Sequence, residues 1–415
     1  MTDGSTPRRV AFVTARYPPM RTSGTYRVEA VMEFLPRHGF DIEVVTLPTE
    51  WMKYQSRQDL DGSAVDAHQP EASTDRIVRY LSTVRYVNWL QRAVLVPDLL
   101  APWARSVARR MGEQLQGIDI VYGTSPPYSG MIAAQRLADA LGVPCVQELR
   151  DPPSFHRALR RRSDFYAKRM VRFERKYLSR ADHVITVTPR TRLRLLDLHP
   201  GLDPARLHVV TNGYPDVDVD PALAGRDPDK FTLTYVGTFQ GSVRAREESV
   251  FTPATLMDAL GTLPPEKTSL RIVGGASSQQ KKNLKKMDPH GVIDFVGLVD
   301  REVALAETAA ADVAVILADD DDWWIGRKAF EYLRYAHTIL AIVPPGDTTD
   351  LLQSHTRADV VSPNDLHQIP AVVKRRFEEW SRGDWEKGPV PDSIQTDESC
   401  VSGIAEVLSA ALSGR

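Results

Sequence analysis

The sequence contains only two cysteines, Cys145 and Cys400, in a chain of 415 residues. They lie far apart and match neither a zinc-ligand spacing nor a CxxC motif, so neither a disulfide framework nor a structural zinc site is expected. Cys145 stands within the apolar run VPCVQEL, which is typical of a small core residue. A reduced compartment is the simplest setting for such a chain.

The sequence also lacks an excess of charge of one sign and any long hydrophobic run. The 52 Lys and Arg residues nearly balance the 54 Asp and Glu residues, and the net charge of −2 gives no general attraction to nucleic acid. The first residues, MTDGSTPRRVAFVT, hold only a short apolar run, well below the length of a signal-peptide core or a membrane span. These absences predict a cytoplasmic protein.

Short apolar runs alternate with helix-length segments along the chain, which at this length favours two soluble domains. Near-continuous Val/Ile/Thr runs separated by helices predict parallel strands buried on both faces. The first array comprises RVAFVT, DIEVVT, IDIVYGT, PCVQEL, HVITVT and LHVVTN, with helices expected over 25–37, 129–141 and 160–179. The second comprises FTLTYVG, LRIVGG, VIDFVG, VAVILA, TILAIV and ADVVSP.

A stretch rich in Pro, Asp and Gly separates the two arrays at residues 211–230 and is typical of a linker. The fold predicted is therefore α/β, with two Rossmann-like doubly wound domains facing across a cleft. The expected boundaries are an N-terminal domain at 1–214, a linker at 215–230, a second domain at 231–390, and a C-terminal helix at 391–415 that packs back on the N-terminal domain.

The loops that follow the strands should carry the ligand site. After the first strand, TARYPPMRTSGTY places Gly24 at the start of a helix, where free N–H groups suit a phosphate or a sugar hydroxyl. A GxGxxG fingerprint is absent, and a plain strand-to-helix turn is an equal alternative. Two later loops, SPPYSG with Ser125 and RDPPSFH with Arg150, Asp151 and His156, supply further polar candidates. The alternative for Asp151 is a pairing with Arg150 or a helix cap.

In the second half, YVGTFQGSVRARE combines Gly237 and Gly241 with Arg244 and Arg246. Cations beside a glycine-rich turn suit a diphosphate whose charge grows as it leaves. The alternative is that these are ordinary surface arginines. The runs IVGG and FVGLVD also end in glycine, which offers backbone contacts to a flat base.

Four consecutive aspartates at 319–322 raise the question of a metal site. Metal loops space their ligands, so a solvated loop before the helix that follows Gly326 is favoured. On that helix Ala329, Leu333 and Ala336 form the packing stripe. Glu331 lies opposite this stripe and is placed to accept hydrogen bonds from a ribose diol.

The stretch at 157–180 is strongly basic, with aromatic and aliphatic residues at helical spacing. A solvated helix face is the simpler interpretation. The alternative is contact with an acidic membrane surface or a phosphorylated acceptor. Peripheral contact with the inner face of a membrane is therefore left open.

Taken in order, YPPMRTSGTYRV, TSPPYSG, ELRDPP, ADHVITVTPRTRLRL, VVTNGYPDVD, YVGTFQG, IVGG, FVGLVDREVALAETAAADVAVI and KAFEYLRYAHTILAIVPPGD resemble one known family. The chain resembles the retaining GT-B glycosyltransferases of family 4, especially the branch that builds O-antigens and capsules, over roughly residues 8 to 385.

The resemblance implies roles for individual residues. Gly24 matches a glycine loop near the donor phosphate, and Arg244 falls at the position of a phosphate-binding lysine. The turn from Gly297 matches the lining of the base pocket, Glu331 matches the second glutamate of an E-x7-E motif, and Lys328 matches a basic residue before FEY. The predicted sets are catalytic Arg244, Asp151 and Lys328; donor-binding Gly24, Gly237, Thr238, Arg246, Gly274, Gly297, Leu298, Val299, Trp323 and Glu331; and acceptor-binding Ser125, Arg150 and His156.

Three positions depart from the family pattern. The first glutamate of E-x7-E is replaced by Trp323, and the usual phosphate-binding arginine by Thr238. The histidine of the family's N-terminal domain corresponds to the region of Arg150 and Asp151. An unusual donor sugar or an altered mechanism is therefore open.

The family implies transfer of a sugar from UDP, GDP or a related nucleotide to an acceptor, with retention and without a metal or other cofactor. A soluble small-molecule acceptor is favoured slightly over a lipid-linked glycan. Two alternatives remain: a sugar-nucleotide epimerase or phosphorylase of the same fold, and a non-catalytic nucleotide-sugar-binding subunit.

Overall fold

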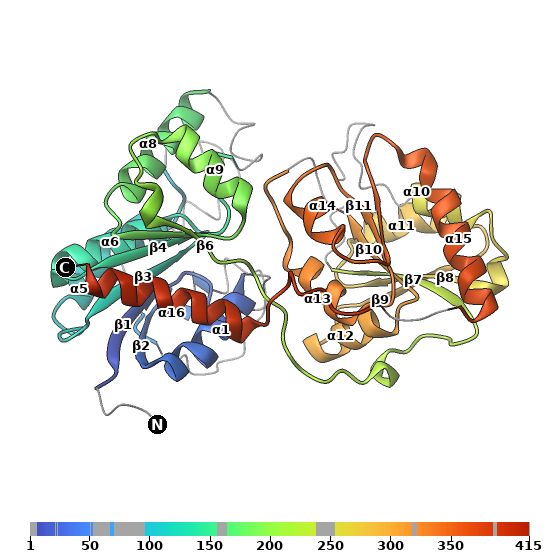
Figure 1. Cartoon of the computed structure of the whole chain (residues 1–415), viewed down its shortest axis with the longest axis horizontal. Helices are drawn as coiled ribbons and strands as arrows, with labels where there is room; N and C mark the ends of the chain where they lie inside the picture. The colour runs from blue at the N-terminus through green and yellow to red at the C-terminus, as the bar shows by residue number, and fades with distance from the viewer. Residues whose placement is uncertain are drawn as a thin grey trace. The chain divides into compact units, whose positions relative to one another are not determined.

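The computed structural model places the chain in two compact units, Met1–Asn212 with Asp397–Arg415, and Gly213–Thr396 (Figure 1). We call them the N-terminal and C-terminal units. The residues that the structure describes are 6–20, 22, 24–49, 51–52, 67–69, 96–155, 164–237, 254–317, 322–384 and 388–414.

The N-terminal unit is built on a parallel sheet in the order β2-β1-β3-β4-β5-β6. Its strands are β1 (Arg8–Val13), β2 (Phe40–Val45), β3 (Ile120–Ser125), β4 (Cys145–Leu149), β5 (His183–Thr186) and β6 (Leu207–Val209). Because β3 and β4 are buried along their whole lengths, each reads as an apolar run rather than an alternation. The order reverses between β1 and β3, which makes this pair the topological switch point.

The C-terminal unit repeats the plan with the order β12-β11-β10-β7-β8-β9. Its strands are β7 (Phe231–Val236), β8 (Thr268–Val273), β9 (Ile293–Gly297), β10 (Val313–Leu317), β11 (Ile339–Ile342) and β12 (Ala358–Val361). All recorded pairings are parallel. Here the switch point lies between β7 and β10.

Helices cover the N-terminal sheet, and the last helix of the chain is among them. They are α1 (Thr25–Phe34), α5 (Ala101–Met111), α6 (Ser129–Leu141), α8 (Asp164–Leu178), α9 (Pro189–Leu198) and α16 (Asp397–Ser413), with short 3-10 turns at Leu35–His38 and Pro204–Arg206. Figure 1 shows α16 beside α1. Ile404 and Leu408 of α16 are fully buried in one core with Val28 and Val31 of α1.

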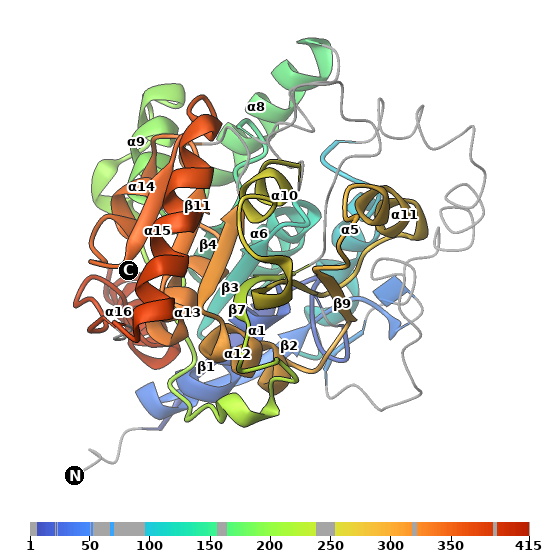
Figure 2. The same ribbon diagram turned by 90° about the vertical axis from the view of Figure 1, so that its right-hand side faces the viewer.

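Helices cover both faces of the C-terminal sheet. They are α10 (Ala254–Leu260), α11 (Ser278–Lys286), α12 (Arg301–Ala310), α13 (Arg327–Tyr335), α14 (Asp347–Leu352) and α15 (Ile369–Arg382), with 3-10 turns at Pro221–Leu223, Pro265–Lys267 and Leu366–Gln368. Leu260 of α10 and Val373 of α15 share one core, whereas Leu333 of α13 and Leu352 of α14 belong to a second. Figure 2 turns α10 and α15 toward the viewer.

Each predicted strand run contains one observed strand, and the prediction of two doubly wound α/β domains is confirmed. The predicted helix at 25–37 is instead α1 followed by a 3-10 turn with Pro36 at its start, because proline donates no N–H to an α-helix. The described part of the predicted helix at 160–179 is α8, from Asp164 to Leu178.

The segment expected as a linker, 215–230, lies against the C-terminal unit. The Tyr335 hydroxyl donates to the carbonyl oxygens of Pro215 and Val217, and Arg226 pairs with Asp312 at 2.6 Å. These contacts explain why the division between the units falls earlier, after Asn212.

Within the described part of the chain, no helix is long and apolar enough to span a bilayer.

Candidate active site

The predicted site residues follow the strands at the switch point of each sheet. In the C-terminal unit Gly237 ends β7, while Trp323, Lys328 and Glu331 follow β10. In the N-terminal unit Gly24 follows β1 and Ser125 ends β3. Ligands of doubly wound folds bind at these carboxyl ends. In each unit, the predicted residues named above therefore lie where a ligand of that unit would bind.

Three neighbouring strands of the C-terminal sheet end in glycines with positive φ. The φ angles are 143° at Gly237, 135° at Gly274 and 87° at Gly297. The Gly237 N–H donates to the Val273 carbonyl at 2.6 Å, and the Gly274 N–H donates to the Gly297 carbonyl at 2.6 Å. A Cβ at Gly274 would collide with the backbone of Gly237. The glycines therefore form a tight edge that another residue type would push apart.

Lys328 brings a positive charge to this edge. It lies in the first turn of α13, and its ammonium occupies the space that a Cβ of Gly237 would need. The Nζ atom is 5.5 Å from the centre of the Tyr235 ring, a cation–π contact. Among the described residues Lys328 has no ion-pair partner within 4 Å, so its charge is left for a ligand.

Burial lowers the pKa of Lys328 from its ordinary value to about 8, although nearby Glu331 acts in the opposite direction. The protonated form attracts a diphosphate, and a bound diphosphate in turn raises the lysine pKa. If a diphosphate binds at this edge, its affinity should be constant below pH 7 and fall by up to about ten-fold per pH unit above pH 8. Calorimetric titrations between pH 6.5 and 9.5 would measure this, and Lys328→Met should flatten the profile.

Glu331 is held one turn further along α13. Its Oε1 atom accepts from Arg327 at 3.1 Å and from Arg301, at the start of α12, at 3.4 Å. Because both arginines use the same oxygen, Oε2 has no partner among the described residues. The pair of arginines fixes the carboxylate while leaving one oxygen available to a hydroxyl.

The loop before α13 contains two adjacent tryptophans in different surroundings. Trp323 is 3% exposed, whereas Trp324 is 36% exposed. The loop is anchored to α14, because the Asp347 N–H donates to the Asp322 carbonyl at 2.7 Å and the Thr348 hydroxyl donates to the Trp324 carbonyl. The indole that reaches the surface is therefore that of Trp324.

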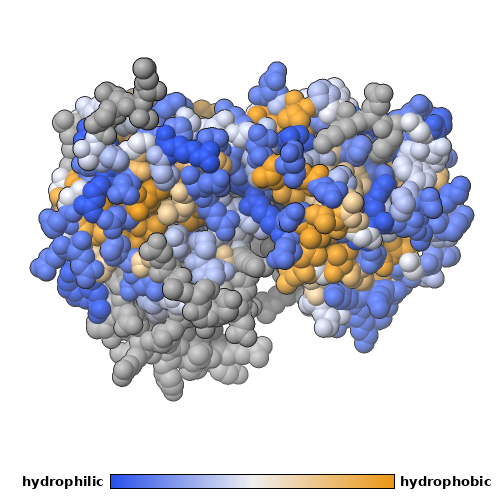
Figure 3. Space-filling model, turned by 90° about the horizontal axis from the view of Figure 1, so that it is seen from below, coloured by the Kyte–Doolittle hydropathy of each residue, from blue (hydrophilic) through white to orange (hydrophobic). Residues whose placement is uncertain are grey.

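Apolar side chains are also exposed beyond the carboxyl end of β9. Leu298 is 83% exposed and directly follows Gly297. Figure 3 shows hydrophobic residues gathered on the visible face of the C-terminal unit and bordered by hydrophilic ones. The placement of Leu298 suits contact with a flat ring, and neighbouring Val299 is partly exposed.

Several predicted residues lie outside the described part of the chain. They are Thr238, Arg244, Arg246, His156, residues 157–163 of the basic 157–180 stretch, and the first three of the four aspartates at 319–322. Among the residues that are described, no group of three or more His, Cys, Asp or Glu side chains could hold a metal ion.

In the N-terminal unit, Arg150 is 8% exposed and binds backbone carbonyls. Its guanidinium donates to Gly24 at 3.0 Å, Pro126 at 3.2 Å and Ser125 at 3.4 Å. Arg150 thus ties together the loops after β1 and β3, an arrangement that residue spacing could not reveal. Ser125 is fully buried, and its hydroxyl donates to the Glu148 carbonyl at 3.0 Å.

Asp151 follows Arg150 and is partly exposed. Among the described contacts no ion pair joins the two residues, because Arg150 binds backbone carbonyls instead. The alternative that Asp151 pairs with Arg150 is therefore not observed. Asp151 is therefore available to a ligand or to the neighbouring segment, and its catalytic assignment stays a prediction.

A buried polar network lies beneath these loops. Arg27 of α1 donates to Glu148 at 2.7 Å and to the Thr211 carbonyl at 2.6 Å, and Thr124 donates to Glu148 at 2.5 Å. Burial alone would raise the pKa of Glu148, but Arg27 and Arg150 together lower it. The network keeps α1, β3 and β4 in register below the site.

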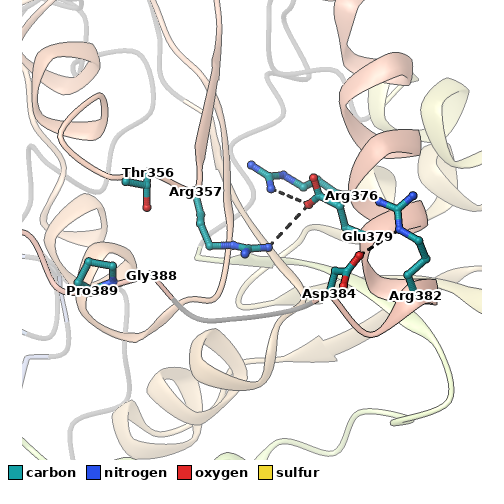
Figure 4. A pocket seen from close by; sticks show the side chains of 8 residues that line it. All are labelled: Thr356, Arg357, Arg376, Glu379, Arg382, Asp384, Gly388 and Pro389. Carbon is teal, nitrogen blue, oxygen red and sulfur yellow. Dashed lines mark hydrogen bonds and ion pairs between the residues drawn. The ribbon is translucent and has the colours of Figure 1, made fainter.

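A separate pocket of about 570 Å³ lies between the residues that precede β12 and the C-terminal half of α15. Figure 4 shows Arg357 and Arg376 both pointing toward Glu379, while Arg382 reaches Asp384. Its arginines are each paired with a carboxylate, and none of the predicted donor-binding residues lines it. We therefore place the candidate site at the glycine edge and not in this pocket.

Sequence reasoning missed Tyr235, Arg301, Arg327 and Trp324. Arg301 and Arg327 start helices that follow strands, so their position was a usable signal. Tyr235 could not be found in this way because it lies inside a strand, where an aromatic residue normally indicates core.

Comparisons with known proteins agree with this arrangement. Residues 24–213 match the family model described as Glycosyl transferase 4-like domain. Sucrose-phosphate synthase from Thermosynechococcus elongatus has a TM-score of 0.63 at 15% identity, with 98% of this chain and 97% of that chain covered. A comparison with curated proteins finds no match.

Two further solved structures share the fold. WaaG, a glycosyltransferase involved in lipopolysaccharide biosynthesis, has a TM-score of 0.62 at 15% identity, with 96% of this chain and 99% of that chain covered. The Anabaena protein HepE in complex with UDP-glucose has a TM-score of 0.57 at 13% identity, with 98% of each chain covered. Residues 24–213 are thus similar to a glycosyl transferase 4-like domain, and the chain shares the two-domain Rossmann-like α/β fold of these solved structures.

Proposed function

We propose that the protein transfers a sugar from a nucleotide diphosphate sugar to an acceptor. The observation that carries the proposal is the Lys328 ammonium, which lies against Gly237 at the switch point without an acidic partner in contact among the described residues. A cation at a glycine edge that permits close approach suits a diphosphate. The UDP-glucose bound to the similar HepE structure supports the same ligand class.

We propose roles for the other residues as well. Glu331 accepts hydrogen bonds from the ribose through Oε2, because Oε1 is occupied by two arginines. Gly274, Gly297 and the exposed Leu298 contact the base, and Trp324, whose ring reaches the surface, borders the sugar in place of the buried Trp323. Lys328, with Arg244, neutralises the leaving diphosphate, so that no metal is required.

We propose retention of anomeric configuration, as the resemblance to family 4 implies. In this mechanism the protein contributes positioning and electrostatic stabilisation more than proton transfer. The N-terminal unit holds the acceptor, with Asp151 as the carboxylate available after β4. The acceptor is a small soluble molecule or a lipid-linked glycan.

The exposed face of α8 supports the lipid-linked alternative. Lys168, Arg172, Arg175 and Lys176 are exposed along this helix, and Phe165 at its start is 66% exposed. Basic residues beside an exposed aromatic ring suit an anionic lipid surface. A cytoplasmic protein with peripheral membrane contact would fit this face.

A panel of nucleoside diphosphates tests the proposal. We expect UDP, GDP or dTDP at about 100 times its dissociation constant to raise the melting temperature by about 5 °C or more, because a ligand stabilises the state that binds it. The sugar donor of the best base should then release its nucleotide when the acceptor, or water at a lower rate, is present.

The same assay separates the alternatives. An epimerase would interconvert two nucleotide sugars without an acceptor and without net nucleotide release. A non-catalytic subunit would be stabilised by the nucleotide but would turn over no donor. If no nucleoside diphosphate changes the melting temperature, the nucleotide-sugar proposal is wrong.

A further inference from the structure

Arg16 carries a charge that the described residues do not neutralise. It lies three residues beyond β1, and its backbone is fixed by Thr14, whose hydroxyl accepts from the Arg16 N–H at 3.2 Å and donates to the Arg16 carbonyl at 3.1 Å. The side chain is half-buried. No hydrogen bond or ion pair of its guanidinium is recorded among the described residues, although its backbone is fully engaged.

A second arginine lies beside it. At Gly24, a Cβ would stand 2.6 Å from the Arg16 Nη1 atom and 3.2 Å from the Arg150 Nη1 atom. Both guanidinium groups therefore pack against the same glycine and are close neighbours. Arg150 is held in place by three neutral carbonyls and has no carboxylate in direct contact among the described residues, although its charge acts on the buried Glu148. Burial, followed by the charge of Arg150, lowers the pKa of Arg16.

The other buried arginines in the described part of the chain each have a carboxylate in direct contact. Arg27 pairs with Glu148, Arg271 with Glu307, and Arg376 with Asp359. The charge of Asp151 acts on Arg16 and raises its pKa, but the two side chains form no ion pair among the described residues. Two adjacent cations without a contacting anion are costly in a half-buried position.

We propose that Arg16 and Arg150 together bind one oxyanion group, a phosphate or a carboxylate, of a substrate. Gly24 provides the room, because any side chain there would displace the Arg16 guanidinium. The two guanidinium groups supply charge-assisted hydrogen bonds that suit a planar or tetrahedral oxyanion. The site deepens the glycosyltransfer proposed above and rests on it for the identity of the substrate.

The oxyanion has two possible sources in such a reaction. It is an anionic group of the acceptor, or it is the phosphate of the nucleotide donor. The C-terminal unit has its own cation for the diphosphate in Lys328, so the acceptor is the favoured source. Binding of inorganic phosphate in the presence and absence of saturating UDP distinguishes the two.

Arg16→Gln is the test variant, because Arg16 holds no other element in place through its side chain. Calorimetric titration of the full chain with inorganic phosphate should show binding that Arg16→Gln weakens about ten-fold or more. If the acceptor is the source, phosphate still binds with UDP saturating, and Arg16→Gln leaves UDP affinity unchanged. If the donor is the source, UDP excludes phosphate, and Arg16→Gln weakens UDP as well.

Arg110→Gln, an exposed position on α5, is the matched control and should change neither affinity. Arg16→Lys keeps the charge but loses the planar guanidinium with its paired N–H donors, so it should bind phosphate with intermediate affinity. Unchanged phosphate and UDP affinities in Arg16→Gln would overturn the oxyanion site alone. If the wild-type protein binds none of UDP, GDP and dTDP, the glycosyltransfer proposal itself is wrong.

Discussion

Lys328→Met is expected to lower sugar transfer by about 100- to 1,000-fold, the effect of removing one preorganised group that stabilises developing charge. The ammonium is the cation that the described residues place at the end of β7, against Gly237 and over the Tyr235 ring. The charge on the diphosphate grows as the glycosidic bond breaks, so the loss should be larger in kcat than in nucleotide affinity. The rate of donor turnover at a saturating concentration of nucleotide sugar measures this loss in kcat.

Methionine is a suitable replacement because it retains the length and apolar stem of lysine without the charge. Lys328 forms no ion pair within the described chain, and Glu331 keeps both of its arginines, so no group is left unpaired by the change. The melting temperature without ligand should therefore be unchanged or slightly raised, since a partly buried charge is removed. A loss of activity with intact folding would then be electrostatic in origin.

Lys281→Met is the matched control for Lys328→Met. Lys281 lies on α11 with its Nζ atom 5.7 Å from the Phe295 ring, so it loses the same kind of cation–π contact. We expect no change in turnover for this variant. Wild-type turnover in Lys328→Met would show that the diphosphate is held elsewhere and would remove the main support for the proposed site.

The strand ends of the site could be predicted from the sequence, but their pairing could not. Glycine after an apolar run marks the end of a buried strand, which is why Gly237, Gly274 and Gly297 were found. The meeting of Lys328 with Gly237 depends on the placement of β10 beside β7, although β8 and β9 lie between them in sequence. Local patterns carry no information about that order.

Neighbouring residues of the same type are a second limit of sequence reasoning. Trp323 was singled out because it replaces a glutamate of the family motif. The loop geometry set by Asp322 and Thr348 buries that ring and exposes Trp324 instead. Periodicity does not decide between adjacent positions in an irregular loop, because neither helical nor strand spacing applies there.

Buried charge is the third limit. Glu148 was read only as part of the apolar run PCVQEL, yet it is 1% exposed and pairs with Arg27, which was read as a helix residue. A glutamate inside a strand that is otherwise apolar is a signal for a buried ion pair, since such charges are kept only when they are paired. The partner is 121 residues away and is identified only by the fold.

Glu148→Leu is expected to destabilise the N-terminal unit by about 3–5 kcal/mol, because it leaves the buried Arg27 without its carboxylate. Arg27 would keep its bonds to the carbonyls of Val210 and Thr211, which are neutral. Denaturant unfolding at pH 7, followed by a probe of this unit, would measure the loss. Glu113→Leu, at an exposed position, should change the free energy of unfolding by less than about 0.5 kcal/mol.

The double variant Arg27→Met/Glu148→Leu decides whether the destabilisation comes from the unpaired charge. Replacing both partners of a buried pair by apolar residues is often neutral, so most of the loss should be recovered. The folded-state pKa of Glu148 is lowered, which means that its contribution is complete above the ordinary carboxyl pKa and disappears as the pH falls through the lowered value. The difference between wild type and Glu148→Leu should therefore narrow in acid.

The same pair links stability to the site. Arg27 lies three residues after Gly24, Thr124 precedes Ser125, and Glu148 lies two residues before Arg150. A loosened network would move the loops that position Arg16 and Arg150, so Glu148→Leu should weaken phosphate binding in the N-terminal unit while nucleotide binding through Lys328 persists. Equal loss of both would mean that the unfolding is global, and recovery of phosphate binding in the double variant would show that the network acts by holding these loops in register.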